Sequence, residues 1–197
     1  MVPSERCYRL IKAWEGIMDG DPSTVPLEPY LCPADVVTTG WGHVLRDGAG
    51  RMLKGEEGLA VARAHPLWQI SLDQAEQLLR WDAAAADKAV FAKVGRDVTQ
   101  AQYDAMVSLA FNVGGGPKGF GGSTVLRLHR LGLRGPDPFP DARAEADHLE
   151  AVSRKQAIPS CAADAFPMWS YAKGRYVEGL YRRRLQERGV YLGEHGP

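Results

Sequence analysis

One short segment constrains the fold of this chain more than any other. Residues 30–54 are rich in Val, Thr, Trp and Tyr, and Asp47-Gly48 lies between two apolar stretches, which is a hairpin signal. The patterns on both sides of this segment are helical. A chain that surrounds one small antiparallel sheet with helices belongs to the α+β class, and we expect it to be mostly α.

Helical patterns cover most of the remaining chain. Residues 4–18 carry apolar side chains at helical spacing. Two helix starts are marked by capping boxes, because Ser71 is followed three residues later by Gln74, and Thr99 by Gln102. Further helices are expected over residues 123–131, 142–155 and 180–188, and surface loops over the Pro-rich stretches 133–141 and 158–167.

Composition excludes several classes of protein. The 197-residue chain has 24 Lys and Arg against 24 Asp and Glu, and a balanced charge argues against a nucleic-acid partner. No apolar run approaches a membrane span, and charged residues near the N-terminus leave no signal-peptide core. The cysteines Cys7, Cys32 and Cys161 are too few for a disulfide framework. We therefore expect one domain, made in the cytoplasm.

Glu15 is the first candidate for acid–base chemistry. It follows Trp14 near the end of the predicted helix and precedes Gly16. Carboxyl groups beside an aromatic ring hold their proton more readily, which suits a general acid; a solvated glutamate at a helix end is the alternative. The segment Cys32–His43 carries a thiol, hydroxyls and two glycines, which fits either a cleft wall or an ordinary twisted strand.

Five ordered blocks of residues form a wider pattern. The N-terminal block joins Glu15-Gly16, Pro29–Ala34 and Thr38–His43, and the later blocks are Ser71–Asp82, Thr99–Gly114, Ser123–Leu126 and Trp169–Glu187. In this order they resemble the phage-type lysozymes, glycoside hydrolase family 24. The resemblance implies one lysozyme-like catalytic domain over residues 1–197. Its hairpin lobe would span about 19–70, its helical lobe about 71–197 plus the N-terminal helix, with a cleft between the lobes.

The catalytic pattern of that family is Glu, then Asp or Cys, then Thr. The resemblance therefore implies Glu15 as general acid, Cys32 at the second position and Thr38 at the third. Six positions separate Cys32 from Thr38, as in the family, but 17 separate Glu15 from Cys32 where the usual pattern has nine. The excess of eight residues falls at about 19–26. Glu28 is the rival acid, but Pro29 follows it where the pattern has Gly.

Three further residues belong to the candidate site. Asp35 stands where relatives commonly have Gly; it either supplies the base function that a thiol fills poorly or is an exposed turn aspartate. Asn112 and Trp41 are candidate substrate-binding residues, because an Asn side chain can hydrogen-bond the acetamido groups of sugars. Core packing is the alternative for Trp41.

The resemblance also implies a function. It points to a peptidoglycan-degrading muramidase that cleaves the β-1,4 bond between N-acetylmuramic acid and N-acetylglucosamine, as in phage endolysins that lyse the host. It implies no metal and no other cofactor. We expect a monomer that needs a holin as partner for membrane passage and acts on the wall in the periplasm. The alternatives are a lytic transglycosylase on the same bond and a catalytically weak wall-binding or virion module.

Three remaining patterns lead to separate predictions. The run Gly114–Gly119 satisfies G-x-G-x-x-G but follows a helical pattern, so we expect a helix end and not a nucleotide site. His43 is predicted to pair with Asp82. A basic cluster, formed by Arg175, Arg182, Arg183, Arg184 and Arg188, either attracts the anionic cell wall or lies on a solvated helix face with Glu187.

Overall fold

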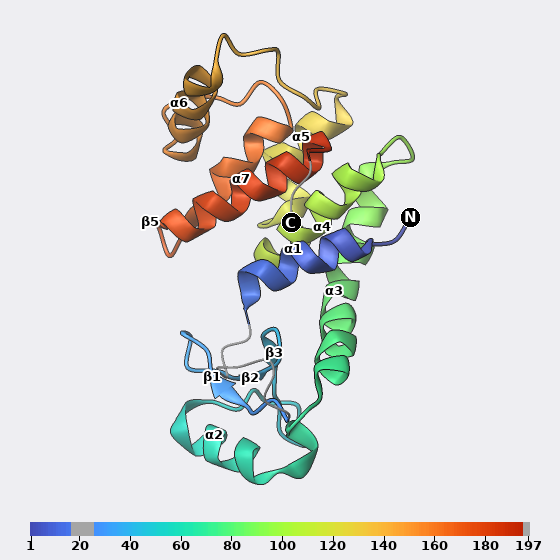
Figure 1. The fold of residues 1–197 in the computed structure, drawn as a ribbon, viewed down its shortest axis with the longest axis vertical. Coiled ribbons are helices and arrows are strands. Elements are labelled where there is room, and N and C mark those ends of the chain that lie inside the picture. The colour runs from blue at the N-terminus through green and yellow to red at the C-terminus, as the bar shows by residue number, and fades with distance from the viewer. Residues whose placement is uncertain (17–25, 195–197) are drawn as a thin grey trace. The chain divides into compact units, whose positions relative to one another are not determined.

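The computed structural model describes residues 1–16 and 26–194, and it is mostly helical with two small antiparallel sheets (Figure 1). The α+β class is therefore confirmed. No helix within these ranges is long and apolar enough to cross a membrane. In chain order the elements, with η for 3-10 helices, are α1 (Glu5–Glu15), β1 (Tyr30–Leu31), β2 (Val37–Thr39), β3 (His43–Val44), α2 (Gly55–Ala64), η1 (Pro66–Trp68), α3 (Leu72–Val94), α4 (Gln100–Val113), η2 (Phe120–Gly122), α5 (Thr124–Arg130), α6 (Ala142–Ser153), η3 (Ala163–Trp169), β4 (Tyr171–Ala172), β5 (Arg175–Tyr176) and α7 (Glu178–Leu192).

The chain divides into two compact units. One unit joins Met1–Leu10 to Ala85–Pro197, and the other, which we call the hairpin unit, is Ile11–Ala84. Helices α1 and α3 each contribute residues to both units. The predicted end of the first helix, residues 17 and 18, and the predicted insertion, apart from Pro26, lie outside the described residues.

A three-stranded antiparallel sheet organises the hairpin unit. Strand β2 lies between β1 and β3, with Tyr30 opposite Thr38 and Thr39 opposite His43. The predicted Asp47-Gly48 turn is present: Asp47 N–H donates to the Arg51 carbonyl at 2.9 Å, and Asp47 Oδ1 accepts from the Ala49 and Arg51 backbone. The turn predicted at Asp47-Gly48 is therefore confirmed. Hydrogen bonds between residues close in sequence stabilise it.

Helix α2 was not predicted from the sequence, and it completes the core of this unit. Its buried Leu59 and Ala62 pack with Val37 and Leu45 of the hairpin segment. Lys54 precedes the helix without any side-chain cap, so the usual sequence signal for a helix start is missing. The helix is held by burial of these apolar side chains against the sheet rather than by its own ends.

Both predicted capping boxes are confirmed. Ser71 N–H donates to Gln74 Oε1 at 2.8 Å and Gln74 N–H to Ser71 Oγ at 3.2 Å; Thr99 and Gln102 form the same reciprocal pair. Helix α4 ends at Val113, and Gly114 follows with a φ of 81°. The glycine run is therefore a helix end, which lacks the strand-to-helix context of a dinucleotide site.

The C-terminal half of the other unit departs from the sequence prediction in two places: the strands β4 and β5 form a second antiparallel sheet that was not predicted, and a predicted loop is partly buried. Residues 133–141 form the expected surface loop, but residues 161–167 are buried and the 3-10 helix η3 begins within them. Phe166 and the small alanines pack against helix α7. The prediction of a surface loop over 158–167 is wrong for residues 161–167, because their apolar side chains have a helix to pack on.

Candidate functional site

Glu15 lies at the C-terminal end of helix α1, next to the hairpin turn. It is the last residue of the helix, and Gly16 follows with a φ of 62°, which turns the chain away from the helix axis. A Cβ added at Gly42 would lie 3.9 Å from Glu15 Oε2. Gly42 therefore lies beside the carboxyl group, whereas Gly40 lies against Ala75, where an added Cβ would be 2.9 Å from the Ala75 Cβ.

Tyr30 lies at the centre of the polar residues on the sheet. Its phenol donates a hydrogen bond to the Gly40 carbonyl at 3.2 Å, and its backbone pairs with Thr38 across β1 and β2. The Thr38 hydroxyl donates to the Tyr30 carbonyl oxygen at 3.4 Å. Thr38 is only 2% exposed and Tyr30 9%, so these contacts hold the strand pair rigidly.

The electrostatic surroundings of Tyr30 bring the predicted catalytic residues together. Burial raises the pKa of the Tyr30 phenol, the nearby Glu15 and Cys32 raise it further, and polar contacts with Thr38 and Gly42 oppose the rise. Glu15, Cys32 and Thr38 therefore all interact with Tyr30 within the hairpin unit. Tyr30 lies in the stretch Pro29–Ala34 of the sequence pattern, but the pattern assigns it no role, since a Tyr in a strand is usually a packing residue.

Cys32 opens a tight turn between β1 and β2. Its N–H donates to the Val36 carbonyl and its own carbonyl accepts from Asp35 N–H, both at 2.9 Å. The thiol is partly exposed and forms no disulfide. Asp35 is exposed and has a φ of 60°, the left-handed conformation in which glycine is favoured. The turn alternative for Asp35 fits this geometry, and it accounts for the Gly of relatives at this position.

The rival acid Glu28 has different surroundings. Its side chain is 56% exposed, and Glu28 Oε2 lies 3.8 Å from Arg63 Nε. Glu28 therefore lies at the surface, within ion-pair distance of Arg63 and directed toward solvent. Glu15, by contrast, is partly buried next to the hairpin. These surroundings favour Glu15 as the acid of the candidate site.

Trp41 is packed inside the hairpin unit. It is 9% exposed, and the Lys12 ammonium lies 5.0 Å from the centre of its ring. Lys12 Nζ also contacts Glu76 Oε1 at 2.6 Å, and this hydrogen bond lowers the pKa of the Glu76 carboxyl. Most of the indole is therefore covered by protein. A role for Trp41 in substrate binding remains a prediction.

The predicted pairing of His43 with Asp82 is confirmed. His43 Nδ1 on strand β3 lies 3.0 Å from Asp82 Oδ2 on helix α3, and both side chains are partly buried. The contact ties the sheet to the first half of α3 within the hairpin unit. The contact holds the imidazole ring of His43, the last residue of the segment Cys32–His43, in one orientation.

Asn112 belongs to the other compact unit, on the last turn of helix α4. Asn112 Oδ1 accepts a hydrogen bond from Arg184 Nη2 at 2.6 Å, while the residue itself is exposed. Because the oxygen is engaged, the amide NH2 is the group that Asn112 can offer to a ligand. No local pattern around Asn112 indicates that an arginine distant in sequence sets the orientation of this amide.

The predicted basic cluster is largely a buried ion network, so neither interpretation offered for it is correct for Arg183, Arg184 and Arg188. These three are 3%, 0% and 5% exposed, and Glu187 between them is 0% exposed. Arg184 Nη1 lies 2.7 Å from Glu187 Oε2, and Arg188 Nε lies 3.0 Å from Asp164 Oδ1. Buried guanidinium groups need carboxylate partners. Glu187 on the same helix provides one for Arg183 and Arg184, and Asp164 and Glu145, distant in sequence, provide them for Arg188.

Comparisons with known proteins identify the family of this chain. The phage lysozyme family model matches residues 21–137. The chain is 31% identical to the endolysin of Bacillus phage B103 over 96% of its length, but it spans only 53% of that relative. It is 32% identical to the endolysin of Salmonella phage P22, covering 84% of this chain and 86% of the relative.

A solved structure also matches. It is the muramidase domain of SpmX from Asticaccaulis excentricus, with a TM-score of 0.60, 25% identity and 96% of each chain covered. The family model covers more than half of this chain, and the P22 endolysin matches over most of both sequences. The chain therefore belongs to the phage lysozyme family.

Proposed function

We propose that this chain degrades peptidoglycan as a muramidase, cleaving the β-1,4 bond between N-acetylmuramic acid and N-acetylglucosamine. The observation that carries the proposal is the grouping of Glu15, Cys32 and Thr38 around Tyr30 in one compact unit. These are the residue types of the family's catalytic pattern in the family's order. The relatives supply the substrate class, because one of them is a muramidase domain and others are endolysins.

In the proposed reaction Glu15 gives its proton to the glycosidic oxygen. The bond between that oxygen and C1 of N-acetylmuramic acid breaks, positive charge develops on the sugar, and a water oxygen adds to C1. The proton that this water loses passes to solvent, from which Glu15 regains the proton it gave. Thr38 donates its own proton to the Tyr30 carbonyl, so its oxygen can accept from this water and orient it. The orienting role suits Thr38, whose position is fixed on both sides by the sheet.

The presence of a thiol at position 32 makes a second reaction a candidate. An ordinary thiol is mostly protonated at pH 7 and accepts a proton poorly, so activation of water is the weak step of the proposed hydrolysis. A lytic transglycosylase needs the acid and no activated water. Mass spectrometry of the released muropeptides distinguishes the two: a reducing end supports the muramidase and an anhydro-muramic end the transglycosylase. We expect reducing ends, and Cys32→Asp should lyse at least as fast as the wild type.

The acid is tested by turbidity loss of Gram-negative cells stripped of their outer membrane. We expect Glu15→Gln to lower the rate by about 100-fold or more, since general acids commonly contribute that much. Glu28→Gln is the matched control and should lyse normally. If only Glu28→Gln were inactive, the acid would have been assigned to the wrong residue. If the wild-type protein fails to lyse the cells but still binds purified sacculi, the wall-binding alternative would be favoured instead.

We also propose that the chain acts alone and reaches the wall with the help of a holin-type membrane protein. This proposal rests on membership of the phage lysozyme family. Cells that express the chain by itself should keep their turbidity until the inner membrane is permeabilised with chloroform. Lysis without permeabilisation would contradict the need for such a partner.

A further inference from the structure

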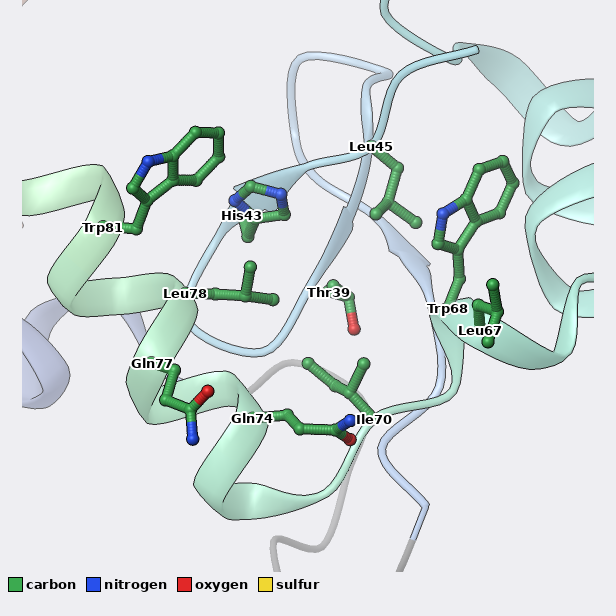
Figure 2. A pocket seen from close by; sticks show the side chains of 10 residues that line it. All are labelled: Thr39, His43, Leu45, Leu67, Trp68, Ile70, Gln74, Gln77, Leu78 and Trp81. Carbon is green, nitrogen blue, oxygen red and sulfur yellow. The ribbon is translucent and has the colours of Figure 1, made fainter. Parts of the chain in front are cut away.

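A pocket with an internal volume of about 510 Å³ lies within the hairpin unit, apart from the residues assigned to catalysis. Pockets of this size hold small organic ligands. Figure 2 shows its lining, which comes from the sheet segment, the 3-10 helix η1 and the first turns of α3. The residues that line it are Thr39, His43, Leu45, Leu67, Trp68, Ile70, Gln74, Gln77, Leu78 and Trp81.

The pocket faces away from the proposed catalytic group. Thr38 and Thr39 are neighbours in strand β2, and successive strand residues point to opposite faces of a sheet. The Thr38 side chain contacts the Tyr30 carbonyl, whereas Thr39 lines the pocket. A ligand in the pocket would therefore lie on the other face of the sheet from Thr38.

Thr39 provides the observation that points to a ligand. The residue is 0% exposed, and its hydroxyl oxygen has no hydrogen-bond partner among residues 1–16 and 26–194. Figure 2 shows this hydroxyl pointing from β2 toward Ile70 and Gln74. Buried polar groups are almost always paired in native proteins, so an unpaired hydroxyl on a pocket wall suggests a partner from outside the chain.

Gln74 offers a second oriented polar group. Its Oε1 accepts from the Ser71 backbone in the capping box, so its NH2 is the part of the amide left to act as a donor. Gln74 and Gln77 both line the pocket, whereas Lys, Arg, Asp and Glu are missing from the lining described above. The polar groups suit an uncharged ligand that both donates and accepts hydrogen bonds.

The apolar part of the lining suits a ring. Trp68 and Trp81 lie on opposite sides of the pocket, with Leu45, Ile70 and Leu78 between them (Figure 2). Trp81 is 69% exposed, which leaves much of its indole available to a ligand. Indole rings present flat apolar faces with one polar edge, and such faces match the C–H face of a pyranose.

We propose that this pocket binds an N-acetylhexosamine residue of a glycan. The acetamido methyl would pack on the floor of Ile70 and Leu45, its N–H would meet the Thr39 oxygen, and its carbonyl would accept from the Gln74 NH2. A plain hexose has a hydroxyl in place of the acetamido group, so it offers neither the methyl for the apolar floor nor the amide carbonyl for Gln74. The site is independent of the catalytic proposal, because none of its residues takes part in the proposed reaction.

The proposal is tested by nuclear magnetic resonance of the full chain carrying Glu15→Gln, which prevents turnover. The chain has five tryptophans, so their indole N–H signals report on separate places once single Trp→Phe variants assign them. We expect N,N′-diacetylchitobiose to shift the Trp68 and Trp81 signals saturably, with a Kd on the order of 1 mM for so small a contact. Cellobiose, which lacks acetamido groups, should leave both unchanged.

Three variants separate binding from folding. Thr39→Val removes only the hydroxyl, and Gln74→Glu keeps an acceptor for Ser71 but removes the NH2; each should weaken binding by about fivefold, the usual value of one hydrogen bond. Thr39→Val should not lower the unfolding midpoint, because it replaces an unpaired buried group by a methyl. Phe91→Ala, exposed and outside the pocket lining, is the control and should bind normally.

The proposal would be overturned by shifts confined to Trp41, which place the sugar near Glu15, or by equal shifts with cellobiose. Unchanged affinity in Thr39→Val would also reject it. These outcomes are separate from the lysis assay, in which Glu15→Gln alone tests catalysis. Either proposal can therefore fail without the other.

Discussion

Asn112 and Arg184 form a hydrogen bond of 2.6 Å between the amide oxygen of one and the guanidinium of the other. Arg184 is fully buried and is held in turn by Glu187, whereas Asn112 is exposed. The amide of Asn112 is thus oriented from inside the protein, with its NH2 left to meet a ligand.

Asn112→Asp tests this orientation. The aspartate keeps an acceptor for Arg184 but loses the NH2, so we expect the free energy of unfolding to change little and lysis to fall by about fivefold to tenfold. Asn112→Ala loses both groups and should lower stability as well. Urea unfolding and the turbidity assay check the two effects. Normal lysis by Asn112→Asp would show that the NH2 is not used.

Glu187 holds the buried ion network together, since its carboxylate contacts Arg183, Arg184 and the Ser108 hydroxyl. We expect Glu187→Gln to lower the free energy of unfolding by about 3 to 5 kcal/mol, because it leaves buried guanidinium charges without a carboxylate. Glu178→Gln, on the same helix but in an exposed pair with Arg182, is the control and should cost less than about 1 kcal/mol. If urea unfolding showed that Glu187→Gln and Glu178→Gln lower the free energy of unfolding equally, the buried network would not be important for stability.

His129 makes the folded state sensitive to acid. It is 1% exposed, its Nδ1 lies 2.7 Å from the Tyr191 hydroxyl, and burial together with Arg134 lowers its pKa from 6.5 to about 4. Between these two values the unfolded chain binds a proton that the folded chain does not. Stability must therefore fall as the pH falls from 6.5 to about 4, by at most about 1.4 kcal/mol per pH unit from this group.

His129→Asn should remove this contribution. The asparagine can still contact Tyr191 but does not titrate, so the slope of unfolding free energy against pH should be shallower than in the wild type below pH 6.5. Urea unfolding at several pH values between 7 and 4.5 measures it. His65→Asn, at an exposed position that caps η1, controls for the loss of a histidine. An unchanged slope in His129→Asn would show that His129 is protonated in the folded state as easily as in the unfolded one.

Asp35→Gly separates a turn residue from a catalytic base. Glycine adopts a φ of 60° without strain, so we expect stability to be unchanged or raised by up to about 1 kcal/mol. Lysis should stay within about twofold of the wild type, which is the size of ordinary surface effects. A loss of lysis comparable to that of Glu15→Gln would instead assign the base function to Asp35.

Local sequence determined the parts of this protein that local interactions can stabilise. The capping boxes at Ser71 and Thr99, the turn at Asp47 and the helix end at Gly114 each satisfy their hydrogen bonds within a few residues. The signature residues Glu15, Cys32 and Thr38 could be proposed because they lie in one ordered pattern. Their chemistry is carried by residue type, which a sequence states directly.

Tertiary structure decided the features that depend on distant partners. Helix α2 has no capping signal and exists because it covers the sheet, and Arg188 is buried because the distant Asp164 and Glu145 meet it there. The pocket behind β2 likewise needs Thr39 and Trp81 to come from separate elements. The cost of burying a charge or a hydroxyl depends on which groups surround it, and only the folded chain brings those groups together.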